Sequence, residues 1–174
     1  MIGGLLRLLV VGVIAAAIDR ILATRAAGPE PEPIRSMVVI DAPIERVWNV
    51  LADIERQPEW MDEMKSVRMT TPPPTGVGSR GEATVRIFGI SVTDPVTITE
   101  FEPPHRLAVR HEGLFTGGGS ITLESGVDGS STIVRWEETL IPPLLPHLGA
   151  MLQRPVLAII FQQDLHNLRT LIET

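Results

Sequence analysis

The side chains in this sequence best suited to acid–base chemistry are His111 and Glu138. Alternate side chains of a strand point to the same face, and His111 shares this parity with Leu107 and Val109. By the same argument, Glu138 shares a face with Trp136 on a later strand. A histidine beside a carboxylate can transfer a proton at a bound substrate. The two residues are therefore candidates for an acid–base pair, and the alternative is that both end their strands in water.

Other kinds of site have little support. His105, His147 and His166 are expected on a turn or on the surface of the last helix, without the paired spacing of metal ligands. The chain has no cysteine, which excludes disulfides and thiolate metal sites. The glycine-rich segment FTGGGS stands between two strands rather than between a strand and a helix, so it lacks the context of a phosphate loop. We expect no metal and no cofactor.

Composition limits the class of protein. The 174 residues suffice for one domain with a real core plus appendages. A net charge of −6 argues against nucleic acid as the main partner, because phosphate binding requires a basic surface. Fifteen glycines, fifteen prolines and only 4% aromatic residues predict many turns and few large side chains to fill the interior.

The first 27 residues differ from the rest of the chain. Residues 1–27 are predicted to form an apolar helix that acts as a membrane anchor, because the stretch 1–22 approaches the roughly 20 residues that a bilayer requires. The alternatives are a cleaved signal peptide and a helix packed on the domain or on a second copy. Residues 28–33, GPEPEP, are predicted to be an extended linker.

The domain is expected to cover residues 34–174. Apolar spacing predicts two short helices over residues 42–61 and one long helix over residues 147–174. Alternation and turn signals predict about seven strands, which successive hairpins join into a curved antiparallel sheet of an α+β fold. The expected strands are 34–42, 64–70, 79–89, 90–102, 105–113, 119–125 and 131–140.

One helix with so few aromatic residues cannot fill the concave face of such a sheet, so we expect a cavity for a small apolar ligand. Side chains of the expected inner faces are the candidates for ligand contact. They are Val85, Val109, His111, Phe115 and Trp136 from the sheet, with Met151 and Phe161 from the last helix.

Five segments in this order resemble one known family. They are MVVIDAPIERVWNVLADIERQPEWM, GVGSR, TEFEPPHRLAVR, DGSSTIVRWEE and QQDLHNLRTLIE. Together they resemble the polyketide cyclase/dehydrase and lipid-transport family of the START-like (SRPBCC) superfamily, over residues 34–174. The resemblance implies the helix-grip fold, in which a curved sheet surrounds a long C-terminal helix. It also implies that Trp60 packs at the rim of the cavity, where it would contact the ligand.

Three functions remain open at this point. The first is non-catalytic binding of a lipid, polyketide or isoprenoid between the sheet and the last helix. The second is a cyclase or dehydratase that uses His111 and Glu138 in the same cavity. The third is a membrane-tethered interaction module with a collapsed cavity. By analogy with this fold the domain is expected in the cytoplasm, associated with the membrane through residues 1–27, and the oligomeric state is left open.

Overall fold

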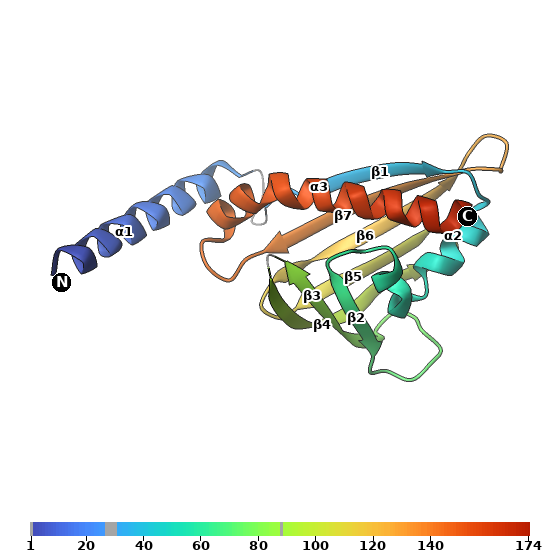
Figure 1. Cartoon of the computed structure of the whole chain (residues 1–174), viewed down its shortest axis with the longest axis horizontal. Coiled ribbons are helices and arrows are strands. Elements are labelled where there is room, and N and C mark those ends of the chain that lie inside the picture. Colours follow the sequence, from blue (N-terminus) through green and yellow to red (C-terminus); the bar gives the residue numbers. More distant parts are fainter. Residues whose placement is uncertain (1, 27–30, 88) are drawn as a thin grey trace.

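A seven-stranded antiparallel sheet curves around one long C-terminal helix in the computed structural model (Figure 1). The structure describes residues 2–26, 31–87 and 89–174. The helices are α1 (Ile2–Arg25), α2 (Ile44–Leu51), the 3-10 helix η1 (Ile54–Glu59) and α3 (Pro146–Glu173). The strands are β1 (Ile34–Ile40), β2 (Met64–Met69), β3 (Arg80–Ile87), β4 (Ile90–Glu102), β5 (Arg106–Glu112), β6 (Thr116–Ser125) and β7 (Thr132–Ile141).

The strand order is β1-β7-β6-β5-β4-β3-β2, so the first strand pairs with the last one and every other pair is a hairpin. This arrangement confirms the predicted α+β fold, with its antiparallel sheet and its long C-terminal helix. The two short helices were predicted from the spacing of Ile44, Val47, Trp48 and Leu51, and these four side chains are the buried face of α2. The spacing of apolar residues was enough to predict α2, because the helix has a single apolar face and packs that face against the core.

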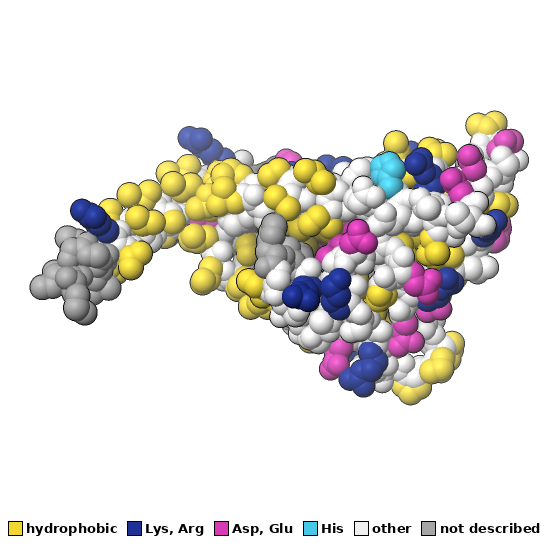
Figure 2. Space-filling view, in the orientation of Figure 1, with side chains coloured by type: hydrophobic (Ala, Val, Ile, Leu, Met, Phe, Trp, Pro, Cys, Tyr) yellow, Lys and Arg dark blue, Asp and Glu magenta, His cyan; other side chains and the backbone are white. Residues whose placement is uncertain are grey.

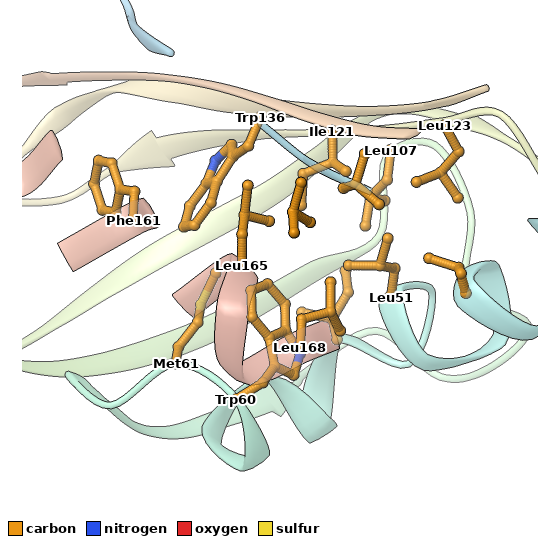
Figure 3. Packing of buried hydrophobic residues seen from close by; sticks show 14 of the residues in the cluster. Leu51, Trp60, Met61, Leu107, Ile121, Leu123, Trp136, Phe161, Leu165 and Leu168 are labelled. Atoms are coloured by element: carbon orange, nitrogen blue, oxygen red, sulfur yellow. The ribbon is translucent and has the colours of Figure 1, made fainter. Parts of the chain in front are cut away.

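The core lies between the sheet and the second half of α3. Leu165, Leu168 and Ile172 of α3 are almost completely buried. Figure 3 shows Leu165 and Leu168 among the buried residues, with Trp136 and Phe161 at one end of the cluster. The first half of α3 is different, because several of its apolar side chains are exposed. The helix therefore stabilises the domain with its second half and leaves its first half free for another role.

Side chains of α3 also bind the outer edge of β1. The side-chain amide of Gln162 donates to the carbonyl of Met37 at 3.0 Å and accepts from its N–H at 3.4 Å. Glu173 Oε1 accepts from the N–H of Asp41 at 2.8 Å. The guanidinium of Arg154 donates to two carbonyls just before β1. These bonds occupy main-chain groups of an edge strand that has no strand neighbour on that side.

The N-terminal segment is helical, as expected, and α1 extends away from the domain (Figure 1). In the described part of the chain no helix is both long and apolar enough to cross a membrane. The prediction of a membrane-spanning anchor is therefore not supported. Of the predicted linker, residues 28–30 lie outside the described residues, and residues 31–33 lead directly into β1.

One end of α1 is attached to the start of α3. Asp19 Oδ1 accepts hydrogen bonds from the N–H groups of His147, at 2.9 Å, and Leu148, at 2.8 Å. The first N–H groups of a helix have no partner within the helix, so Asp19 acts as an N-cap supplied by another helix. Figure 2 shows apolar side chains along α1 and over the neighbouring part of α3. Of these, Leu8 and Val13 are 72% and 68% exposed.

Candidate functional site

A cavity of about 570 Å³ lies between the concave face of the sheet and the first half of α3. Its sheet wall is formed by apolar side chains of β3 to β7, and η1 with the loop after it closes one side. Leu152, Val156 and Leu157 cover it from α3. The space exists because Leu157 is the first buried side chain of α3, so no side chain from the turns before it fills the interior.

Most of the residues predicted to contact a ligand line this cavity. They are Val85, Val109, His111, Phe115, Trp136 and Phe161. They come from β3, β5, β7, α3 and the loop between β5 and β6. Alternation along a strand determines which side chains face inward, so the parity argument from sequence places the sheet residues correctly on the cavity face.

Two predicted contacts are not in the lining. Trp60 is 1% exposed and lies edge-on behind Trp136, with 6.1 Å between ring centroids, so it belongs to the core behind the cavity rather than to its rim. Met151 is 49% exposed. It precedes Phe161 by ten residues, which places it about 80° away from Phe161 around the helix axis. The neighbouring Leu152 and Gln153 line the cavity instead.

His111 and Glu138 meet at the cavity surface. His111 Nε2 lies 2.8 Å from Glu138 Oε1, and Trp136 Nε1 donates to Glu138 Oε2 at 2.9 Å. The two residues belong to β5 and β7, which β6 separates by about 9.6 Å. Side chains on β6 would normally fill the space between them.

Glycines in β6 make this contact possible. Gly117 is opposite His111 and Gly119 is opposite Glu138 in the strand register. A Cβ atom on Gly119 would lie 2.1 Å from Glu138 Oε2, where the carboxylate now sits. The segment FTGGGS therefore provides space for a buried carboxylate. Sequence reasoning had only excluded it as a phosphate loop.

Hydrogen bonding determines which nitrogen of His111 is available to a ligand. An ionised carboxylate only accepts, and Glu138 accepts from Trp136, so Nε2 of His111 carries a hydrogen and donates it. Burial of the imidazole disfavours its charged form. The hydrogen bond to Glu138 and the negative charges of Glu138 and Asp94 outweigh this effect, so the pKa of His111 is raised above its usual value.

A second polar feature was not predicted. Asp164 of α3 is 1% exposed and interacts with Glu63, which lines the cavity on the opposite side from β7. Asp164 Oδ1 accepts from the N–H of Asp62 at 3.3 Å. Asp164 Oδ2 and Glu63 Oε2 are buried, and neither has a hydrogen-bond donor among the described residues.

The pair of acids holds a proton at neutral pH. Burial, followed by the charge of Glu63, raises the pKa of Asp164 to about 8. Burial also raises the pKa of Glu63. A proton shared between the two carboxyls removes most of their repulsion. One signal was present in the sequence: Asp164 is three residues after Phe161 and four before Leu168, which places it on the apolar face of α3.

Among the described residues, no three His, Asp or Glu side chains are arranged to hold a metal ion. The ionisable groups of the cavity lining are the pair His111 with Glu138, Glu63 with its neighbour Asp164, and Asp94.

Comparisons with known proteins agree with the fold. The profile of the family described as "Polyketide cyclase / dehydrase and lipid transport" matches residues 34–173. No curated protein matches the chain. Among solved structures, a conserved protein from Geobacillus kaustophilus is similar with 17% identity and a TM-score of 0.60, covering 79% of this chain and 93% of that one.

Two further structures carry more specific names. A START superfamily protein from Mycobacterium smegmatis has 16% identity and a TM-score of 0.56, covering 78% of this chain and 99% of that one. The Zhui aromatase/cyclase from Streptomyces sp. R1128 has 16% identity and a TM-score of 0.57, covering 80% and 94%. At such identities the structural likeness concerns the fold, whereas the family profile covers nearly the whole domain. This chain belongs to the polyketide cyclase/dehydrase and lipid-transport family.

Proposed function

We propose that the protein binds one small hydrophobic ligand, of the lipid, polyketide or isoprenoid type, between the sheet and α3. The observation that carries the proposal is the cavity of about 570 Å³ with its mainly apolar lining. Ligand sites typically enclose about 300–1,000 Å³ and have few polar groups. The family description, which includes lipid transport, supports the same class of ligand.

The first half of α3 provides the entrance in this proposal. Leu152 and Val156 line the cavity but are 65% and 39% exposed, so they form part of its rim. An apolar rim lets a hydrophobic molecule keep contact with apolar atoms while it enters. The first half of α3 buries fewer side chains than the second half, so the contacts that its movement would break are mainly the hydrogen bonds of Asp19, Gln153 and Arg154.

The test is a cavity-filling variant. Val109→Phe adds a ring where Val109 lines the cavity opposite Gly119, and we expect the affinity for the neutral fluorescent probe N-phenylnaphthylamine to fall at least about tenfold. The matched control is Val39→Phe, because Val39 is exposed on the opposite face of β1. Unchanged probe affinity in a folded Val109→Phe protein would contradict the proposal. Mass spectrometry of the purified protein under native conditions would identify a retained ligand.

A second candidate function is a cyclase or dehydratase reaction in the same cavity. One observation favours it: His111 and Glu138 are in direct contact, with 2.8 Å between Nε2 and Oε1, at the cavity surface. In its neutral form His111 can take a proton at Nδ1 from a bound substrate, and Glu138 then stabilises the imidazolium. For a dehydration, the same proton would be returned to the leaving hydroxyl group, which departs as water.

The two functions predict different bound molecules. A catalyst purified from cells would retain its product, whereas His111→Asn would retain the substrate, which is heavier by one water for a dehydration. A binding protein would retain the same molecule in both cases. Identical masses from the wild type and from a folded His111→Asn variant would therefore exclude a dehydration, and identical chromatographic retention of the two molecules would also exclude a cyclisation, which leaves the mass unchanged.

A further inference from the structure

More acidic than basic side chains line the cavity. Three carboxyl groups line it, Glu63, Asp94 and Glu138, together with one imidazole, that of His111. Within the described residues, no lysine or arginine is part of the lining. Because water is scarce in an apolar cavity, these charges act on a bound molecule with little screening.

Two of the three acids are bound in a way that leaves negative charge in the cavity wall. Asp94 accepts from the N–H groups of Leu114 and Phe115, at 2.8 and 3.0 Å, which is the arrangement of an ionised carboxylate. Glu138 accepts from two side chains, as described above. Glu63 and Asp164 form an acidic pair in which burial raises both pKa values, so this pair supplies no cation to offset the other two acids.

The single imidazole cannot balance this charge. A protonated His111 offsets one carboxylate, namely Glu138, to which it is hydrogen-bonded. Asp94 and the Glu63–Asp164 pair remain without a cation in the lining. A ligand carboxylate or phosphate placed in the cavity would therefore be repelled by like charges at low dielectric.

We infer that the cavity accepts uncharged or basic apolar molecules and rejects acidic ones, so that its ligand is an apolar alcohol, ketone or amine rather than a fatty acid or an acyl phosphate. This inference rests on the proposed binding function. It assigns the acids of the lining a role in selectivity that the apolar walls alone cannot provide.

His111 supplies the contact for the polar group of such a ligand. Its Nε2 is committed to Glu138, and its Nδ1 has no hydrogen-bond partner among the described residues. A neutral imidazole accepts a hydrogen bond at Nδ1 and a protonated one donates there. A ligand hydroxyl can donate or accept, so it satisfies Nδ1 in either protonation state.

The experiment compares probes of one chain length and different charge. Dodecanol, dodecylamine and dodecanoate each compete with N-phenylnaphthylamine for the full-length protein at neutral pH, below the concentrations at which they form micelles. Dodecylammonium and dodecanoate both lose the hydration of a full charge on entry, so the comparison between them isolates the sign of the charge. We expect dodecanoate to need at least about tenfold higher concentration than either of the others.

Substitutions locate the source of the discrimination. Asp94→Asn should reduce the difference between dodecylamine and dodecanoate, because Asp94 has no cation beside it among the described residues of the lining. Glu112→Gln is the matched control, because Glu112 follows His111 on β5 but is exposed and bonded to Thr97 instead of lining the cavity. It should leave the difference unchanged.

The outcomes separate this inference from the function on which it rests. Displacement by dodecanoate at the same or lower concentration than dodecylamine would overturn the inference and leave the binding function intact. A difference that Glu112→Gln reduces as much as Asp94→Asn would also overturn it, because the lining would not be its source. Failure of the fluorescent probe to bind at all would overturn both.

Discussion

Replacing Asp164 with asparagine should make the stability of the protein less dependent on pH. In the folded state the pKa of Asp164 is about 8, compared with an ordinary value of 3.8. Between these values the folded protein holds a proton that the unfolded chain has released. The free energy of unfolding therefore falls as pH rises through this window, by up to about 1.4 kcal/mol per pH unit. Asparagine does not titrate and lacks this contribution.

The size of this change in stability depends on the pH range between the two pKa values of Asp164 and on the interaction of Asp164 with Glu63. Two pH units, from pH 5 to pH 7, correspond to at most about 3 kcal/mol. Part of this dependence remains in the variant, because burial also raises the pKa of Glu63. We therefore expect the free energy of unfolding of Asp164→Asn, relative to that of the wild type, to rise by about 1–3 kcal/mol between pH 5 and pH 7. The asparagine can still accept from the N–H of Asp62 and can donate to Glu63.

Urea unfolding followed by tryptophan fluorescence, at pH 5, 6, 7 and 8, gives the required free energies. The control is Asp53→Asn, because Asp53 is an exposed acid just before η1. For the control the difference from the wild type should be the same at every pH. The assignment of a bound proton to this pair would be refuted if the free energy of unfolding of Asp164→Asn, relative to the wild type, stayed constant or fell between pH 5 and pH 8.

Three further substitutions test other contacts. Gly119→Ala should lower the free energy of unfolding in urea by about 2–4 kcal/mol, because the new Cβ displaces the Glu138 carboxylate from its two hydrogen bonds. A loss below about 1 kcal/mol would contradict this explanation. Asp19→Ala should lower the free energy of unfolding by about 1 kcal/mol and speed amide hydrogen exchange in the first turn of α3. The control Arg20→Ala should do neither. Equal exchange rates in both variants would exclude Asp19 as the N-cap of α3. Trp60→Phe should cost less than the roughly 3–5 kcal/mol typical of truncating a buried tryptophan to alanine, because a phenyl ring keeps most of the packing and the indole Nε1 has no partner to lose within the described residues. A loss as large as that of Trp60→Ala in urea unfolding would contradict this.

Features that depend on short-range periodicity could be predicted from the sequence. The buried face of α2 and the inward direction of His111 both follow from spacing within one element. Met151 was misplaced by the same reasoning, because the face of α3 that meets the cavity in the first half of the helix, with Leu152, Gln153 and Val156, is not a continuation of the face that Phe161 buries in the second half. Spacing is therefore reliable within a strand or a short helix and less so along a helix of 28 residues.

Features that depend on pairing between distant elements could not be predicted with confidence. His111 and Glu138 were candidates for a pair on the condition that their strands bring them together, and this contact requires that β6 lie between them and carry glycine at the right register. The interaction of Glu63 with Asp164 joins residues about 100 positions apart through the docking of α3. Neither partner of that pair has a local pattern that indicates the other.

The bonds from α3 to the edge of β1 have a consequence for how copies of this chain behave toward one another. An unpaired strand edge is a template for a strand from another molecule and hence a starting point for aggregation. Gln162 and Glu173 occupy this edge only when α3 is in place, and α3 follows all seven strands in the chain. A nascent or truncated chain without α3 thus exposes both an apolar sheet face and an open edge. The same coupling would limit exchange of the proposed ligand, because lifting all of α3 would open the edge. Exchange through the first turns of the helix leaves Gln162 and Glu173 bound and keeps neighbouring molecules apart.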